Sequence, residues 1–235
     1  NGSSLHDLIS ELLERTEIPR LRLASVEPWD LPDHFFQLFQ NPRLMPHMHL
    51  PLQSGCDSVL RRMARRCKTA EFERLVERAR SEIPLFNVTT DLIVGFPGET
   101  DAEWKQTLRF VERVGFGHMH IFSFSPREGT KAARMVDPVA EEVKRLRSRE
   151  LHALAESMKT AALDQHVGKE YEILWERRNQ TGAWTGYTPH FHRVSMVSEM
   201  GLSGKIVRQT IRSLDRPSGR LLAMDPLQTI EVIPV

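Results

Sequence analysis

Short apolar segments alternate with longer segments of helical periodicity from Arg20 to Phe124. A strand, a helix and a second strand in succession predict parallel strands joined by crossover helices. The alternation therefore restricts this part of the chain to an α/β fold. The predicted strands cover Arg20–Ser25, His47–Leu52, Phe86–Val94 and His118–Phe124. The predicted helices run from a cap at Ser3 or Ser4 to Pro19, near His34–Phe39, over Ser58–Arg66 and Ala70–Glu82, and onward from the capping box of Thr100 and Glu103.

The pattern changes after Asp137-Pro138, which is typical of a helix start. The predicted helix runs to about Gln165, with an apolar stripe at Val143, Leu146, Leu151, Leu154 and Met158. Short alternating segments separated by turn residues follow, and they predict a small β-barrel. The predicted strands are Tyr171–Trp175, Gly182–Tyr187, Arg193–Ser198, Gly204–Leu214, Arg220–Ala223 and Thr229–Val232. We therefore predict an α/β domain over residues 1–136, a connecting helix over 137–165 and a β-barrel domain over 166–235.

Composition excludes several classes of protein. The 235 residues carry 32 Lys and Arg against 31 Asp and Glu, so affinity for nucleic acid requires a local basic patch. No stretch approaches the length of apolar sequence that spans a membrane. The two cysteines, Cys56 and Cys67, are too few for a disulfide framework or an iron–sulfur cluster. We expect both to be free thiols in a reducing cytoplasm.

Small and polar residues cluster after each of the four predicted strands. The clusters are Ser25–Pro28, Pro51–Asp57, Gly95–Thr100 and Ser125–Thr130, with Asp91 inside the third strand. Each cluster taken singly is typical of an ordinary turn. Because the carboxyl ends of parallel strands meet at one edge of a sheet, all four together favour a shared ligand site.

Three His-x-His pairs are present, at His47/His49, His118/His120 and His190/His192. Residues two apart on a strand share a face, as the metal ligands of many barrel hydrolases do. The alternative interpretation, which we favour, is that each histidine is a partly buried strand residue bonded to a neighbour. Only Asp91 offers a carboxylate for a metal site of this kind.

Basic and aromatic residues are interleaved in the predicted β-barrel. This pattern is typical of binding to single-stranded nucleic acid, in which cations contact phosphates and rings stack on bases. Composition gives equal support to an alternative without RNA binding, in which the aromatic residues form the barrel core and the arginines lie at its rim. The candidate RNA-binding residues are Arg177, Arg178, Trp184, Tyr187, Arg193, Lys205 and Arg208.

Four long strings carry a resemblance to a known family. They are Arg22–Pro28, His49–Asp57 with Val59–Met63, Thr90–Thr100 and Phe124–Thr130. In this order they resemble the methylthiotransferases of the radical S-adenosylmethionine (SAM) class. The resemblance implies a partial parallel (β/α) radical SAM barrel followed by a TRAM domain, a small OB-like all-β barrel. Glu27–Leu31 and Trp184–Thr188 resemble most the MtaB-type branch, which acts on threonylcarbamoyladenosine.

The resemblance also implies an activity. Such enzymes use S-adenosylmethionine and two [4Fe-4S] clusters to methylthiolate C2 of N6-threonylcarbamoyladenosine next to the tRNA anticodon. The alternative substrate within the family is isopentenyladenosine. The implied partners are a tRNA anticodon arm and an electron donor, with no membrane or DNA, in the cytoplasm. The implied cofactor contacts are Ser25, Glu27, Gln53, Ser54, Asp57, Val94, Gly95, Phe96 and Pro97.

The chain departs from the family in its cysteines. The family holds one cluster with three closely spaced cysteines and a second with three cysteines in a separate N-terminal domain. Neither set is present here, so no catalytic or metal-binding residue is assigned within this chain. We expect the chain to be the C-terminal portion of such an enzyme and inactive by itself. A metal-dependent barrel hydrolase and a non-catalytic RNA-binding module remain as alternatives from other classes.

Overall fold

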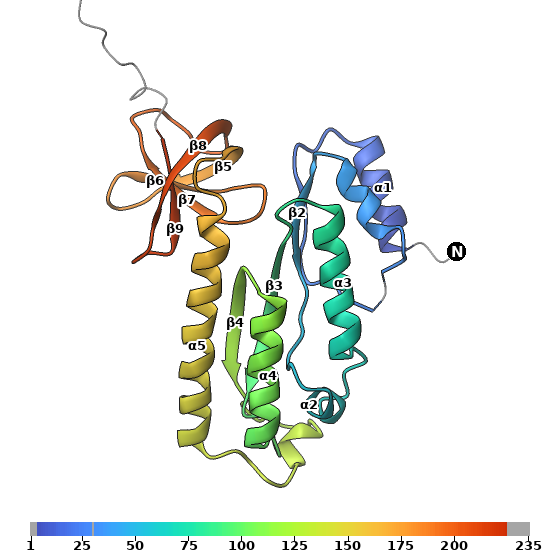
Figure 1. Ribbon diagram of the computed structural model, residues 1–235. Helices are drawn as coiled ribbons and strands as arrows, with labels where there is room; N and C mark the ends of the chain where they lie inside the picture. Colours follow the sequence, from blue (N-terminus) through green and yellow to red (C-terminus); the bar gives the residue numbers. More distant parts are fainter. Residues whose placement is uncertain (1–3, 30, 225–235) are drawn as a thin grey trace, which may run out of the picture. The chain divides into compact units, whose positions relative to one another are not determined.

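The computed structural model describes residues 4–29 and 31–224, and the chain divides into two compact units, residues 1–158 and 159–235 (Figure 1). Each unit has its own hydrophobic core. The predicted strand at Thr229–Val232 and the alternative cap at Ser3 lie outside the described residues, as does Asp30 of the family-like string. Within the described residues, no helix is both long and apolar enough to cross a membrane.

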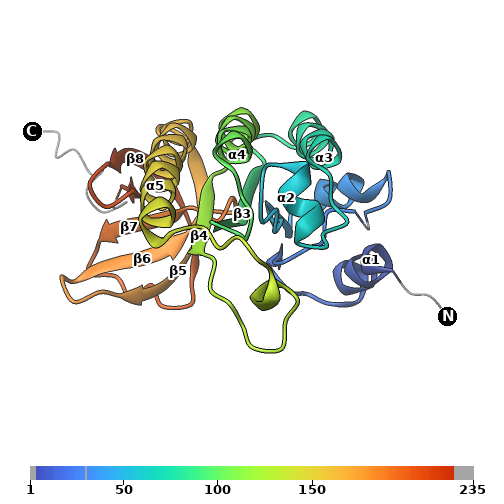
Figure 2. The ribbon, with the colours of Figure 1, turned by 90° about the horizontal axis from the view of Figure 1, so that it is seen from below.

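The first unit contains a four-stranded sheet in the order β1-β2-β3-β4. Every neighbouring pair is parallel, as the strand–helix alternation predicts. The strands are β1 (Leu21–Leu23), β2 (Leu44–His49), β3 (Asn87–Val94) and β4 (His118–Ser123). Helices α3 (Thr69–Glu82), α4 (Asp101–Val114) and α5 (Glu141–Asp164) lie along one face of this sheet (Figure 2).

Strand alternation separates two chemically different faces of the sheet. Val88, Leu92 and Val94 of β3 are almost fully buried in the core, on the side that the helices cover. Residues two apart share a face, so Thr89 and Asp91 project to the other side. That second face carries the polar residues of β2, β3 and β4, and it is the face available to a ligand.

Capping fixes the starts of two helices. In α1 (Leu5–Arg15), Ser4 and Asp7 form a reciprocal capping box. In α4, Thr100 and Glu103 form the predicted box, and Trp104, Val111 and Val114 are buried as expected. The remaining short helices are η1 (Phe35–Gln40), α2 (Asp57–Arg62) and η2 (Ala132–Arg134).

Several predicted boundaries in the first unit are displaced. The first helix ends at Arg15 rather than at Pro19, and the first strand ends at Leu23 rather than Ser25, which has a φ of 57°. The second strand ends at His49 rather than Leu52, since Pro51 has no N–H for the sheet ladder. Helix α2 ends at Arg62 rather than Arg66, because Ala64 adopts a φ of 56°, which a right-handed helix does not admit.

The predicted start of α5 is wrong. Asp137 has a φ of 67° and does not cap the helix, which begins at Glu141. The Asp137 carbonyl instead accepts the N–H of Gly98 at 2.8 Å. Asp137 is therefore bonded to a residue far away in sequence, although the local sequence pattern predicted it as a helix cap.

The second unit is a closed five-stranded barrel in the order β5-β6-β7-β9-β8. Ile173, Trp175, Val194, Ile211 and Leu221 are fully buried in its core. This confirms the predicted small all-β barrel. The strands are β5 (Glu170–Arg178), β6 (Ala183–Tyr187), β7 (Arg193–Val197), β8 (Ile206–Asp215) and β9 (Arg220–Ala223).

Candidate functional site

A pocket of about 480 Å³ lies at the carboxyl ends of β3 and β4. Gln53 enters it from the loop after β2. This residue has a φ of 74°, and its backbone bridges β3 by accepting from Ile93 N–H and donating to the Asp91 carbonyl. The loop is therefore held to the strand end. The pocket is lined by Gln53, Ile93, Phe122, Ser123, Phe124, Ser125, Arg127, Thr130 and Ala132.

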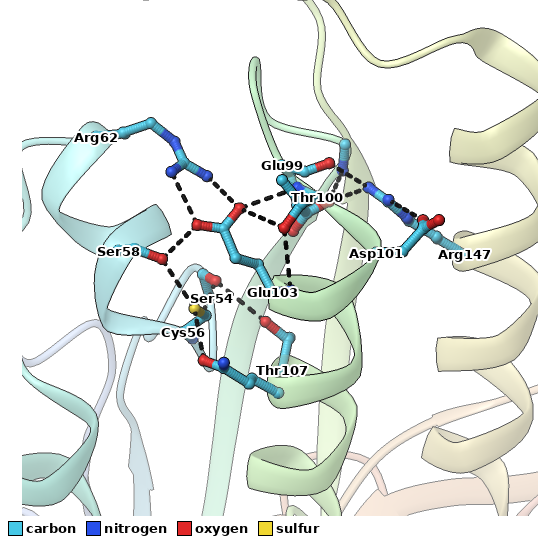
Figure 3. A network of polar contacts seen from close by, with 12 residues as sticks. Ser54, Cys56, Ser58, Arg62, Glu99, Thr100, Asp101, Glu103, Thr107 and Arg147 are labelled. Carbon is cyan, nitrogen blue, oxygen red and sulfur yellow. Dashed lines mark hydrogen bonds and ion pairs between the residues drawn. The ribbon is translucent and has the colours of Figure 1, made fainter.

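The loop from Gly95 to Glu99 is fixed by a buried ion pair. Glu99 Oε2 accepts the Gly95 N–H at 2.8 Å and lies 2.9 Å from Arg147 Nη1. Arg147 also bonds the Glu99 carbonyl and Asp101 (Figure 3). Burial raises the pKa of Glu99, while the Gly95 N–H and the Arg147 guanidinium act in the opposite direction. The loop is thus rigidly tied to α5.

Gly95 has a φ of +74°, which supports the expectation that this position favours glycine. The added Cβ of a substitution, however, would lie 2.5 Å from Lys144 Cγ. It would meet the side chain of α5, a neighbour that sequence alone did not reveal. The positive φ and the approach of Lys144 together disfavour a larger side chain at this position.

A second polar network joins α2 to α4 beside this loop. Arg62 donates two hydrogen bonds to Glu103, at 2.9 and 2.7 Å, and Ser58 donates a third (Figure 3). These bonds, led by that of Arg62, hold the pKa of Glu103 at about 2. Glu103 therefore stays ionised and closes the capping box with Thr100 at the same time.

The structure brings only some of the predicted cofactor residues to the pocket. Gln53 lines it, and Ile93 comes directly before Val94. The Ser54 hydroxyl is buried and contacts Thr107 of α4, and Asp57 caps α3 by accepting the Thr69 N–H at 2.8 Å. Ser25 and Glu27 are exposed after β1, with Glu27 3.5 Å from Arg65.

Residues of the fourth strand end were missed as site residues. Phe122 and Phe124 supply apolar surface to the pocket, and Ser125 and Arg127 supply polar groups. The signal was present, since Ser125–Thr130 is one of the four polar clusters found in the sequence. Phe122 could have been found by its place two residues beyond His120 on the ligand face.

Two of the three His-x-His pairs share one face of the sheet, whereas His190 and His192 of the second unit are buried and their rings contact His166. His47 Nε2 and His49 Nδ1 each lie 3.0 Å from Thr89 Oγ1, and the rings of His118 and His120 meet edge to face. The sheet also places His49, Asp91 and His120 together, with one ligand atom of each within 4.8 Å of the others.

In the second unit, a pocket of about 370 Å³ gathers several predicted RNA-binding residues. Arg177, Arg178, Tyr187 and Arg193 line it, together with Arg220, which the sequence analysis did not select. The Tyr187 ring stacks on Phe191 with centroids 4.7 Å apart and an interplanar angle of 9°. The pocket therefore combines cations with an aromatic surface.

The other predicted RNA-binding residues lie elsewhere on the barrel. Trp184 is 8% exposed, and its indole N–H donates to the Ser198 carbonyl, so its ring belongs to the core. Arg208 is exposed and pairs with Glu170 and Glu172. Lys205 is exposed outside the pocket. The core interpretation is therefore confirmed for Trp184, and RNA binding by the exposed cations stays a prediction.

Comparison with known proteins agrees with this architecture. Residues 3–111 match the model of the Radical SAM superfamily. The chain is 42% identical, over 81% of its length, to the threonylcarbamoyladenosine tRNA methylthiotransferase MtaB of Thermotoga maritima. It is 37% identical, over 88% of its length, to the tRNA-2-methylthio-N(6)-dimethylallyladenosine synthase of Bacillus subtilis. It spans 44% and 41% of those relatives.

A solved structure shows the same fold. Coproporphyrinogen III oxidase (HemN) from Escherichia coli, a radical SAM enzyme, superimposes with a TM-score of 0.54 at 14% identity. The match covers 77% of this chain and 50% of that one. The chain therefore matches the radical SAM superfamily over residues 3–111 and is similar to the tRNA methylthiotransferases over most of its length.

Proposed function

We propose that the protein carrying this chain methylthiolates C2 of N6-threonylcarbamoyladenosine next to the tRNA anticodon. The observation that carries the proposal is the 42% identity to the T. maritima MtaB over 81% of the chain. The lower identity to the B. subtilis relative makes dimethylallyladenosine the alternative substrate. An electron donor is the further partner that this chemistry requires, and the proposed location is the cytoplasm.

The pocket at the ends of β3 and β4 is the proposed site for S-adenosylmethionine. Its donor set suits this ligand, because Phe122, Ile93 and Phe124 offer apolar surface to adenine. Gln53 and Arg127 offer polar groups to the ribose and the methionine carboxylate. Bound there, S-adenosylmethionine would supply the methyl group and the hydrogen-abstracting chemistry. Backbone contacts from Val94 to Pro97 belong to the same proposal.

The cysteines of this chain do not suit an iron–sulfur cluster. Cys56 and Cys67 are both buried and lie far apart in sequence, and burial raises the pKa of Cys67 to about 12. A thiolate ligand is therefore unfavourable at Cys67. Any cluster of the whole protein requires other ligands.

The pocket of the β-barrel is the proposed tRNA contact, within a TRAM-type domain. Its guanidinium groups, those of Arg177, Arg178, Arg193 and Arg220, suit phosphates, and Tyr187 suits stacking on a base. Since each phosphate contact releases counterions, binding to an anticodon-arm RNA should weaken steeply with salt.

Analysis of tRNA nucleosides tests the activity. Deleting the gene for the protein should abolish the 2-methylthio derivative of N6-threonylcarbamoyladenosine and leave the unmodified nucleoside in its place. Mass spectrometry of digested tRNA measures both. Loss of the methylthio derivative of dimethylallyladenosine instead would establish the alternative substrate, and no change in either would refute the proposal.

Salt-dependent binding tests the RNA pocket. Arg177→Ala and Arg193→Ala should each weaken binding of an anticodon-arm RNA. Each should also reduce the log–log salt slope by roughly 0.7 to 0.9 for every phosphate that the variant no longer neutralises. Arg216→Ala is the matched control, since Arg216 is exposed, pairs with Asp164 and is not a candidate RNA-binding residue. An equal effect of Arg216→Ala would place the RNA on another face of the barrel.

Titration with S-adenosylmethionine tests the cofactor pocket. Gln53→Ala should weaken binding about fivefold, because it removes one hydrogen bond worth about 1 kcal/mol. The exposed Glu142→Gln on α5 is the control and should bind like the unmodified protein. Unchanged affinity in Gln53→Ala would remove this residue from the site.

A further inference from the structure

Three side chains from adjacent strands converge on the ligand face of the sheet. They are His49 at the end of β2, Asp91 in β3 and His120 in β4. One ligand atom of each lies within 4.8 Å of the other two, and His49 Nε2 is 3.3 Å from Asp91 Oδ1. We propose that these residues bind one divalent transition-metal ion, of the Zn²⁺ or Fe²⁺ class. The proposal goes beyond the proposed function and does not depend on it.

The convergence is a consequence of strand register. Asp91 is paired directly with His120 across β3 and β4, and His49 is paired with Thr89 across β2 and β3. Since residues two apart share a face, Asp91 projects beside the His49 ring. The three ligands thus stand on a hydrogen-bonded sheet, which holds geometry more closely than loops do.

The donor set suits a borderline metal ion. Two imidazoles and one carboxylate are ligands for Zn²⁺ and for Fe²⁺, and three protein ligands leave coordination positions open. An oxygen or nitrogen atom of a bound small molecule would occupy those open positions. Mg²⁺ and Ca²⁺ are disfavoured, because they prefer oxygen ligands.

A second layer of contacts orients His49 for this role. Its Nδ1 lies 3.0 Å from the Thr89 hydroxyl, so Nε2 is the nitrogen directed at Asp91 and at a metal. Metal-binding histidines commonly engage their other nitrogen in this way. The ring of His120 contacts that of His118 edge to face, with centroids 4.8 Å apart.

Accessibility also favours a metal ion over a purely structural cluster. The side chains of His49 and Asp91 are 13% and 26% exposed, and His120 is exposed. A hydrogen bond between His49 and Asp91 explains two of the residues. The His120 ring also contacts the His49 ring, with centroids 5.8 Å apart, and this contact brings the second imidazole beside both.

Cobalt and zinc titrations of the purified 235-residue chain test the proposal. We expect one equivalent of Co²⁺ to give ligand-field bands without a thiolate charge-transfer band, and Zn²⁺ to displace it and raise the melting temperature. Asp91→Asn and His120→Ala should each weaken binding at least tenfold. Thr89→Ala should weaken it about tenfold, because His49 would no longer be held in orientation.

The control is His152→Ala, which removes an exposed histidine of α5 and should bind like the unmodified chain. Circular dichroism establishes whether each variant is folded. If an alanine variant does not fold, the near-isosteric Asp91→Asn is the variant to measure. Absence of stoichiometric binding would overturn the proposal. Full binding by folded Asp91→Asn would also overturn it, since the metal would then be held by other residues.

Discussion

The surroundings of Gly95 and His166 determine how each residue contributes to stability. Gly95 combines a left-handed backbone with a close approach of Lys144. His166 is 2% exposed, and its Nδ1 lies 2.8 Å from the Tyr171 hydroxyl. Both lead to measurable expectations for stability.

Gly95→Ala should destabilise the first unit more than Gly115→Ala does. Both glycines have a positive φ, of +74° and +67°, so both substitutions carry a left-handed backbone cost of about 1–2 kcal/mol. Only at Gly95 does the new Cβ meet another side chain, which adds about 1–3 kcal/mol. Urea unfolding measures the difference. Equal effects would show that Lys144 moves aside without cost.

The stability of the β-barrel should fall as pH falls from about 6.5 toward 4. Burial, with a smaller contribution from Lys169, lowers the pKa of His166 from 6.5 to about 4. Between these values the unfolded chain binds a proton that the folded barrel does not. The free energy of unfolding of the barrel is therefore highest with respect to this group above pH 6.5. It falls by on the order of 3 kcal/mol between pH 6.5 and pH 4.

Unfolding curves followed through Trp175 and Trp184 measure this dependence, with Trp29 and Trp104 replaced by Phe. His166→Gln should flatten the pH dependence, whereas His152→Gln, at an exposed position, should leave it unchanged. If His166→Gln keeps the original dependence, another group of the barrel is responsible.

Helix α5 shows how an element is positioned by polar as well as apolar residues. The sequence predicted an apolar stripe through Leu146, which is 50% exposed. Leu151 of that stripe is fully buried, and the buried face also runs through Lys144, Arg147 and Ala155, which the stripe did not include. Lys144 lies over Gly95, and Arg147 pairs with Glu99. The helix is therefore tied to the loop after β3 by its cations.

Arg147→Ala should destabilise the first unit by about 3–5 kcal/mol, because it leaves the Glu99 carboxylate buried without its ion pair. Arg145→Ala, two residues away on the same helix, removes only an exposed pair with Glu142 and should cost less than about 1 kcal/mol. Denaturant titration compares them. Adding Glu99→Gln to Arg147→Ala should restore part of the stability, and failure to do so would point to packing rather than charge.

For the whole molecule, each of the two units carries one candidate pocket, and the first unit also holds the proposed metal site at His49, Asp91 and His120. The α/β unit holds the pocket beside Gln53, and the barrel holds the pocket lined by arginines. Neither site draws on Cys56 or Cys67, which are both buried. The proposed cofactor and RNA contacts thus lie on different groups of residues, and no residue of this chain is assigned to an iron–sulfur cluster.

The isolated chain should assemble no iron–sulfur cluster. Two buried thiols cannot supply the ligands that such a cluster needs. Anaerobic reconstitution followed by assay of acid-labile sulfide and visible absorption measures this, and sulfide distinguishes a cluster from a single bound iron ion. A stoichiometric four-iron, four-sulfide signal would contradict the expectation.

Local and periodic signals in the sequence determined the architecture. Alternating apolar segments specified four parallel strands and a separate barrel, since a strand or helix buries its apolar residues at its own period. The capping box of Thr100 and Glu103 likewise acts within one turn of helix. The strings near Gln53 and Gly95 were sufficient for the family, because they lie within short contiguous segments.

Only the tertiary structure decided which side chains meet. The Asp137 carbonyl bonds Gly98 where a helix cap was predicted, and Trp184 lies in the barrel core. Arg147, rather than Leu146, is buried, and it pairs with Glu99. These outcomes depend on partners far away in sequence, whose burial and charge a periodic pattern does not encode. The same reason explains why His49, Asp91 and His120 were visible singly, whereas their convergence required the register of three strands.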